Sequence, residues 1–216
     1  MKAIPREVQV CATNSQAIRS LRLSLTLSQL QQNMLIGSLL GDGCLVANSW
    51  KKHYRLMMVQ SHAQKAYIDW KYKQFEEFTL KKPVYKAITN SWSFRTISHP
   101  ELTKWREIFY PFGKKIIPEN INDLLRDPIS IAIWYMDDGS LSSRKDTFIL
   151  NTQSFTFEDN VKLQKCLLQN FGIVTTVNRD KIYYRLYINK ISAKHFESLV
   201  KRHVTMLMSY KLLVTL

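Results

Sequence analysis

LIGSLLGDG (35–43) and IAIWYMDDG (131–139) are the most informative stretches for the fold, because each is an apolar helical run that ends in the same Asp-Gly pair. Three landmarks recur in the second half of the chain at nearly one offset and in the same order: Asp42 and Asp138, Gln60 and Gln153, Lys115 and Lys211. This pattern indicates a duplicated half-molecule, since solenoids need short units repeated at least three times. We therefore expect two similar halves, each built as helix, hairpin, helix, hairpin, helix.

The composition is typical of a folded protein with a polyanionic partner. The 216 residues are 45% hydrophobic and carry a formal net charge of +14, from 31 Lys+Arg against 17 Asp+Glu. The apolar share argues against a disordered chain, and the charge favours nucleic acid or an acidic membrane surface. No acidic residue occurs at 43–68, 78–100 or 181–196, as expected of basic strands that lie along phosphates.

Several classes of site are not indicated. Three scattered cysteines without a CxxC pair indicate neither a zinc site nor a disulfide framework. The chain has no Walker A, GxGxxG or HExxH motif. No apolar run approaches the ~20 residues that a membrane span needs, so we expect no membrane anchoring.

Periodicity and turn residues place the elements. In the first half we expect helices over 28–40 and 61–78, strands near Leu45 and over 53–60, and a hairpin of 84–89 with 92–98. Ser61 with Gln64 predicts a capping box, and Ser98 before Pro100 predicts another helix start. In the second half we expect a helix capped by Asp127 before Pro128, strands near 147–153, 174–179 and 182–188, a helix over 157–171 and a last helix from about Ser192.

The last predicted strand has two faces. Ile182, Tyr184, Leu186 and Ile188 are expected in the core, and Tyr183, Arg185 and Tyr187 on the opposite face. An aromatic and basic face suits a strand that reads a DNA groove, and a solvated sheet face is the alternative.

The expected organisation is an N-terminal arm over 1–27, a first subdomain over 28–115, a linker over 116–126 and a second subdomain over 127–216. Pro118 interrupts regular structure in the linker. The arm weakly resembles an organelle transit sequence, and we expect a flexible or DNA-contacting segment there.

A carboxylate at the C-terminal end of a helix is unfavourable by roughly 0.3–1 kcal/mol, and a divalent cation would compensate it. One Asp-Gly pair is usually a turn, but two in equivalent positions favour a function. Gly37 and Gly41 lie four residues apart and would let two helix backbones approach closely. Packed helices would bring Asp42 and Asp138 together, where both need cations to stay ionised. This arrangement predicts a two-metal site for phosphodiester hydrolysis.

The two runs resemble the signature of LAGLIDADG homing endonucleases in their single-chain form with two motifs. LNTQSFTF (150–157), WYMDDGS (134–140) and KKIIP (114–118) are similar to intron-encoded members, and the resemblance covers about residues 28–213. It implies an α+β fold of two αββαββα subdomains related by a pseudo-twofold axis. Their antiparallel sheets would form a DNA-binding saddle, with the motif helices packed at the interface. Ile133 stands where the pattern has Gly, which makes the helix interface asymmetric.

The resemblance also implies roles for individual residues. Asp42 and Asp138 match the metal-binding catalytic acids, and the backbone carbonyls of Gly41 and Asp137 match further metal contacts. Lys115 and Lys211 match basic residues near the scissile phosphates, with phosphate anchoring alone as the alternative. Gln60 and Gln153 match the flank of the active site, with a helix-entry hydrogen bond as the alternative. The implied cofactor is Mg²⁺, for which Mn²⁺ would substitute.

The implied partner is double-stranded DNA with a long asymmetric target, cut by a monomer to leave short 3′ overhangs. Candidate DNA contacts lie on basic and aromatic strands and turns: Lys51, Lys52, Arg55, Lys86, Arg95, Arg144, Lys145, Arg179, Lys181, Tyr183, Arg185 and Tyr187. The expected location is a mitochondrion, a chloroplast or the bacterial cytoplasm. Two alternatives stay open: a maturase that binds intron RNA on the same fold, and a non-enzymatic DNA-binding regulator.

Overall fold

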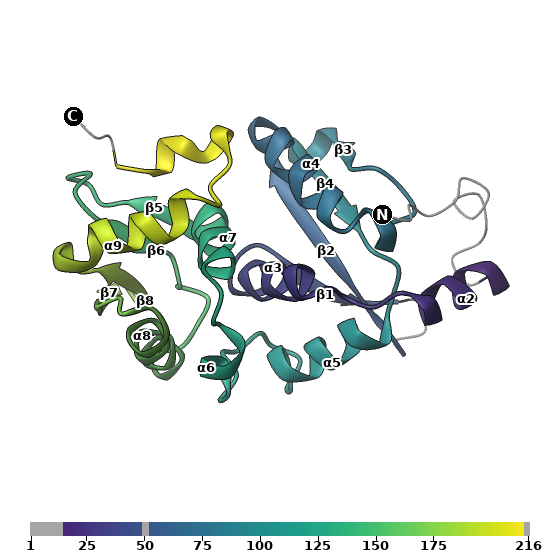
Figure 1. The fold of residues 1–216 in the computed structure, drawn as a ribbon, viewed down its shortest axis with the longest axis horizontal. Coiled ribbons are helices and arrows are strands. Elements are labelled where there is room, and N and C mark those ends of the chain that lie inside the picture. The colour runs from purple at the N-terminus through teal and green to yellow at the C-terminus, as the bar shows by residue number, and fades with distance from the viewer. Residues whose placement is uncertain (1–14, 49–51, 214–216) are drawn as a thin grey trace. The chain divides into compact units, whose positions relative to one another are not determined.

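A computed structural model describes residues 15–48 and 52–213 (Figure 1). The first half contains α2 (Gln16–Ser24), α3 (Gln29–Leu40), β1 (Cys44–Ala47), β2 (Tyr54–Ser61), η1 (His62–Gln64), α4 (Lys65–Gln74), η2 (Glu76–Phe78), β3 (Val84–Lys86), η3 (Ala87–Thr89), β4 (Ser91–Arg95) and α5 (Pro100–Phe109). The second contains α6 (Ile121–Leu124), α7 (Pro128–Asp138), β5 (Gly139–Leu141), β6 (Phe148–Leu150), α8 (Phe157–Phe171), β7 (Thr175–Asp180), β8 (Tyr183–Ile188), α9 (Lys190–Lys201) and η4 (Met206–Lys211).

The two halves repeat one sheet topology. One antiparallel sheet has the order β1-β2-β4-β3 and the other has the equivalent order β5-β6-β8-β7. Helix α4 packs on β2 and β4, and α8 packs on β7 and β8. The predicted α+β class with two related sheet-and-helix repeats is confirmed. The joint saddle of the two sheets stays a prediction.

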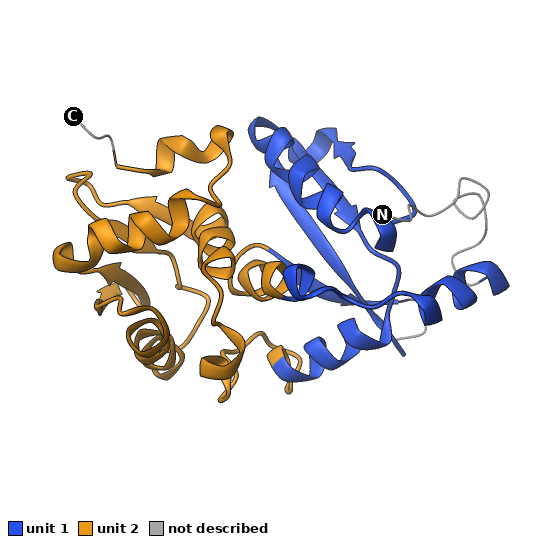
Figure 2. Cartoon of the chain, viewed as in Figure 1, with its two compact units in different colours: residues 1–32, 43–108 blue, residues 33–42, 109–216 orange. Residues whose placement is uncertain are grey.

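The compact units of the chain do not follow the repeats. The described residues within 1–32 and 43–108 form unit 1, and those within 33–42 and 109–216 form unit 2 (Figure 2). Helix α3 therefore starts in unit 1, while its C-terminal part and Asp42 belong to unit 2. The subdomain boundaries proposed from the duplication, 28–115 and 127–216, stay a prediction. Residues 16–24 of the expected arm form α2, and residues 1–14 lie outside the described residues.

Two predicted helix caps are wrong. Ser61 makes no capping bond to the backbone, and its hydroxyl donates to Gln64 Oε1 at 3.2 Å. Helix α5 is capped by His99 instead of Ser98: the Glu101 N–H donates to His99 Nδ1 at 3.2 Å, and the His99 carbonyl accepts from Thr103 N at 3.1 Å. His99 can cap because its other ring nitrogen is held by carbonyls at the end of α2.

Other local expectations are confirmed. Asp127 caps α7 as predicted, with its Oδ1 accepting from Ile129 N at 2.9 Å. On β8, Leu186 and Ile188 are buried, and Tyr184 contacts Phe157 of α8. Ile182 is a correction: it is 72% exposed, because it lies in the β7–β8 turn before the strand begins.

The second sheet starts with a strand for which the sequence analysis assigned no residues. Strand β5 begins at Gly139, directly after the motif acid Asp138. The chain then returns along β6, and Asn151 N donates to the Asp138 carbonyl at 2.9 Å. The motif helix is thus joined to its sheet without a loop, which fixes the position of Asp138.

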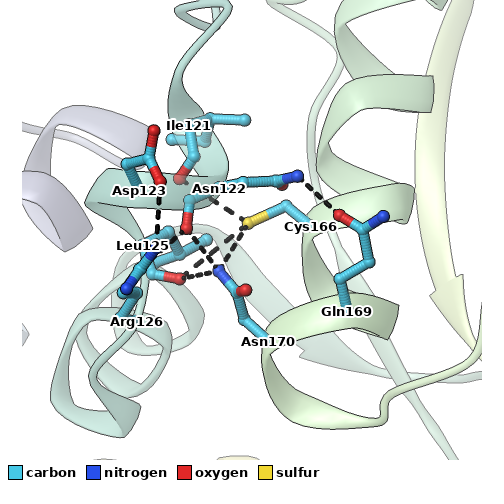
Figure 3. A network of polar contacts seen from close by, with 8 residues as sticks. All are labelled: Ile121, Asn122, Asp123, Leu125, Arg126, Cys166, Gln169 and Asn170. Carbon is cyan, nitrogen blue, oxygen red and sulfur yellow. Dashed lines mark hydrogen bonds and ion pairs between the residues drawn. The ribbon is translucent and has the colours of Figure 1, made fainter.

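The predicted linker, 116–126, contains the short helix α6, which is fastened to α8 (Figure 3). Asn170 Nδ2 donates to the carbonyls of Asn122 and Leu125, at 2.8 Å each. The Cys166 thiol contacts the Ile121 and Leu125 carbonyls, and burial raises the pKa of this thiol to about 12. The linker is therefore a packed part of unit 2. Among the described residues, no helix is both long and apolar enough to cross a bilayer.

Candidate active site

The C-terminal part of α3 packs tightly on α7 within unit 2. A Cβ added at Gly37 would lie 2.3 Å from the Ser130 carbonyl oxygen, and one added at Gly41 would lie 2.5 Å from Asp137 Cβ. Near the start of α7, Ser130 Oγ donates to the Asn33 carbonyl at 2.7 Å. These contacts advance in the same direction along both helices, so their C-terminal ends lie side by side. The close approach predicted from Gly37 and Gly41 is confirmed.

Replacing Gly37 by Ala should destabilise the protein. The new methyl group would collide with helix backbone, which cannot rotate away as a side chain can. We expect a loss of about 1–3 kcal/mol in unfolding free energy, although Gly→Ala in a helix normally gains roughly 1 kcal/mol. Urea unfolding measures this loss. A matched control is Ser38→Ala, which removes a buried hydroxyl that has no hydrogen-bond partner among the described residues. Equal stability of Gly37→Ala and the wild type would contradict the close packing.

The two motif acids interact electrostatically at these helix ends. Asp138 is the last residue of α7 and is half-buried, and Asp42 is exposed in the turn after α3. Burial, then Asp42, then Asp137 raise the pKa of the Asp138 carboxyl to about 7, while Lys115 and Lys211 oppose the rise. The fold therefore holds a carboxylate where its charge is costly, next to two others.

The two lysines bind the ends of the motif helices. Lys115 Nζ donates to the Gly41 carbonyl at 3.0 Å. Lys211 is buried, and its Nζ donates to the carbonyls of Met136 at 2.6 Å, Tyr135 at 3.3 Å and Asp137 at 3.4 Å. Each ammonium group neutralises the negative end of a helix dipole. The compensation for the acidic helix ends, predicted to come from a metal ion, is thus supplied in part by the protein's own lysines.

The raised pKa of Asp138 predicts a pH-dependent stability in the absence of metal. The folded carboxyl has a pKa of about 7, whereas an unperturbed aspartate has a pKa of 3.8, so the folded state binds more protons between these values. Stability should therefore fall as pH rises through this window, by about 1–3 kcal/mol after allowance for solvent screening. Asp138→Asn should remove this part of the slope in urea unfolding with EDTA. An unchanged slope in the variant would contradict the shift.

The two candidate glutamines lie in different units. Gln60 is buried on β2 of unit 1, opposite Trp92 on β4. Gln153 follows β6 in unit 2. With its amide oxygen assigned toward Arg185, that oxygen accepts from Arg185 Nε at 2.5 Å and from Nη2 at 2.7 Å. Arg185 also pairs with Asp180 at 2.6 Å. The structure thus ties Gln153 to an arginine of the sheet, and a role for either glutamine beside the acids stays a prediction.

The sheet of unit 1 has a basic outer face. Leu56 and Met58 of β2 point into the core, so Arg55 and, across the ladder, Arg95 point outward. Burial and then Arg95 lower the pKa of the Arg55 guanidinium. Arg55 Nε is also buried with no hydrogen-bond partner among the described residues. Crowded like charges and an unused donor are typical of an anion-binding surface.

The other predicted DNA contacts are mostly exposed. Lys52 and Lys86 are exposed in unit 1, and Lys51 lies outside the described residues. In unit 2 the exposed set is Arg144, Lys145, Arg179, Lys181 and Tyr183, with Arg185 and Tyr187 half-buried. Asp180, whose ion pair neutralises Arg185 locally, was not predicted from the sequence. Asp180 lies one residue before the acid-free run, so that pattern did not include it.

Comparisons with known proteins agree with this geometry. The profile of the LAGLIDADG DNA endonuclease family matches residues 32–196. The DNA endonuclease I-ChuI of Chlamydomonas applanata is 28% identical over 87% of this chain and 96% of its own length. A probable intron-encoded endonuclease of Wickerhamomyces canadensis is 28% identical over 87% and 86%. The solved structure of the homing endonuclease I-WcaI bound to its DNA recognition sequence has a TM-score of 0.89, with 27% identity over 99% of this chain and 100% of that chain.

Proposed function

Because this chain belongs to the LAGLIDADG DNA endonuclease family, we propose that it hydrolyses one phosphodiester bond on each strand of a long, asymmetric DNA site with divalent metal ions. One observation carries this function: two acids lie at the C-terminal ends of two tightly packed helices, and a lysine donates to carbonyls at each of these ends. A DNA-binding regulator would have no use for a half-buried carboxylate held beside two other acids, because that arrangement costs stability.

The donor atoms fit a hard divalent cation. Asp42 and Asp138 supply carboxylates, and the Gly41 and Asp137 carbonyls can accept from a lysine and still offer a second lone pair. Among the described residues no cluster of three or more His, Cys, Asp or Glu side chains suits a metal. Mg²⁺ fits such a sparse set, because it binds through one or two carboxylates and takes its other ligands from water and phosphate. A divalent ion held there would supply Lewis-acid polarisation of the phosphodiester and would lower the pKa of the attacking water.

The remaining steps belong to the protein. Asp42 and Asp138 lie at the ends of the two motif helices, where the phosphates would react. The close contact of the helix backbones at Gly37 and Gly41 keeps these ends together. Lys115 and Lys211 keep positive charge beside the acids, where negative charge develops on the phosphate during attack. The outward Arg55 and Arg95 bind the duplex, so affinity should fall steeply with added salt.

A cleavage selection tests the proposal. The protein is incubated with Mg²⁺ and a pool of duplex DNA with a randomised segment, and the cut ends are sequenced. One long asymmetric consensus with short 3′ overhangs is expected, from a monomer, in Mg²⁺ or Mn²⁺ but not in EDTA. No cutting in either metal, or equal cutting in EDTA, would sink the proposal.

The sources of the relatives, an alga and a yeast, are compatible with the proposed location in an organelle, and the bacterial cytoplasm remains the other location.

A second candidate, RNA binding as a maturase, is favoured by one aromatic cluster. His62, Tyr85 and Trp92 contact each other on the α4 side of the unit 1 sheet, and Lys65 Nζ lies 4.9 Å from the Trp92 ring. This face is opposite to that of Arg55, so binding of the duplex does not account for it. Exposed rings beside a cation suit stacking with unpaired bases.

Fluorescence quenching separates this second candidate from the first. Single-stranded oligouridine should quench the fluorescence of Trp92. Trp92→Leu should lower the affinity for this RNA while leaving the affinity for duplex DNA unchanged. The matched control is Tyr183→Ala, which removes an exposed ring from the sheet of unit 2. Equal RNA affinity in Trp92→Leu and the wild type would remove the maturase candidate.

A further inference from the structure

The turn before Lys115 carries a large apolar side chain into solvent. Gly113 N donates to the Tyr110 carbonyl at 3.0 Å, and Gly113 has a φ of +79°, which closes a tight turn. Phe112, inside this turn, is 89% exposed. It lies three residues from Lys115, whose ammonium contacts the end of α3 beside Asp42. Phe112 is therefore within about 11 Å of Lys115 along the chain.

The segment before Lys211 repeats this arrangement with different residues. In η4, Met208 and Lys211 are buried, whereas Met206 is 92% exposed, Leu207 43% and Tyr210 63%. Lys211 binds the end of α7 beside Asp138. The three exposed side chains lie on a short helix that is anchored at its C-terminal end by this lysine. Each motif helix end in unit 2 thus has an exposed apolar group next to its lysine.

The place of these exposed side chains in the chain, next to the two lysines of the motif helices, favours DNA as their partner. Large apolar side chains in water cost free energy, and here they come shortly before the two lysines that contact the ends of the motif helices. The edges of the major groove would favour hydrogen-bonding side chains. The minor groove instead accepts apolar wedges, which part neighbouring base pairs and bend the duplex. A basic protein presents this apolar surface to DNA without repulsion, since its net charge is +14.

We propose that Phe112 and the exposed side of η4 (Met206, Leu207 and Tyr210) are two apolar wedges that enter the minor groove on either side of the acid pair and bend the target DNA for cutting. This inference rests on the proposed function, because the acid pair locates the scissile phosphates. The wedges do no chemistry; they are positioning residues that bring the phosphates to Asp42 and Asp138.

Two variants and two DNA duplexes test the wedges. Phe112→Ala and the double variant Met206→Ala with Leu207→Ala are compared with the wild type on the selected target. Both should cut about tenfold more slowly in single-turnover reactions, because the free energy of bending is no longer provided. Both should also lose the rise in 2-aminopurine fluorescence at the central base pairs, measured in Ca²⁺. A central mismatch, which makes bending easier, should restore most of the lost rate.

Controls separate this inference from the nuclease assignment. Ile88→Ala removes a fully exposed side chain from the β3–β4 turn of unit 1, and it should change neither rate nor fluorescence. Phe112→Leu keeps an apolar group and should retain most of the wild-type rate. If the wild type cuts and both alanine variants cut equally fast, the wedges are overturned and the nuclease stands. The wedge proposal is also overturned if the mismatch does not restore the lost rate. It is likewise overturned if the wild type is a dimer and the alanine variants are monomers. Full cutting by Asp42→Asn and Asp138→Asn would overturn both the catalytic assignment of the acid pair and the wedge proposal.

Discussion

Asp42→Asn and Asp138→Asn are each expected to lose double-strand cutting by roughly a thousandfold or more, because an amide is a poor ligand for a divalent cation and leaves the ion weakly held. Asn preserves the shape of each side chain, so the helix packing around Gly41 should remain intact. The loss is measured as the single-turnover rate on the selected target in Mg²⁺. Nicked and fully cut products are quantified separately, which shows whether one acid serves one strand.

DNA binding should respond in the opposite direction. In EDTA, each substitution removes a negative charge from the place where phosphate must approach, so the affinity for the target should stay equal or increase. This sign distinguishes a catalytic acid from a structural one, whose loss would weaken binding and cutting together. The matched control is Asp123→Asn, an exposed carboxylate on α6 that pairs with Arg126. Cutting at the wild-type rate by either motif variant would refute the catalytic assignment.

Lys211→Met should cause the largest loss of stability, about 2–4 kcal/mol in unfolding free energy. Methionine fills most of the buried volume but donates nothing, so the carbonyls of Tyr135, Met136 and Asp137 lose their shared donor. The positive charge that opposes the negative end of α7 is lost as well. Thermal and urea unfolding in EDTA measure the effect without any contribution from metal binding.

Lys115→Met is the internal comparison. Lys115 is only half-buried and makes a 3.0 Å bond to one carbonyl, so its loss should cost about 1 kcal/mol. Both variants should slow cutting, since both lysines lie near the acids. If the two variants lose equal stability, burial of the Lys211 ammonium does not explain its structural role.

Local sequence signals located most elements. The helix predicted over 157–171 has those bounds in the structure, because Thr156 caps it and Gly172 ends it in the left-handed conformation. Alternation on β8 was read correctly at Leu186 and Ile188, which are buried. The signal failed at Ile182, since alternation cannot reveal where a turn ends and a strand begins.

Contacts between residues far apart in the chain could not be predicted from the sequence. Nothing near His99 in the chain indicates that its ring is held by the carbonyls of Arg22 and Leu25, which leaves its other nitrogen free to cap α5. Asp180 likewise forms its ion pair with Arg185 because the β7–β8 hairpin places the two residues side by side. Helix caps and ion pairs of this kind depend on which segments meet in space.

The duplication, the two acidic helix ends and the glycines that let those helices touch could all be predicted from the chain, because each depends on residue type and spacing within one helix or one repeat. The packed fold was needed to show that a buried lysine offsets the negative end of α7, and that Asp138 is desolvated beside two other acids. Burial and electrostatic coupling arise from the whole packed environment of a group, so no linear pattern specifies them.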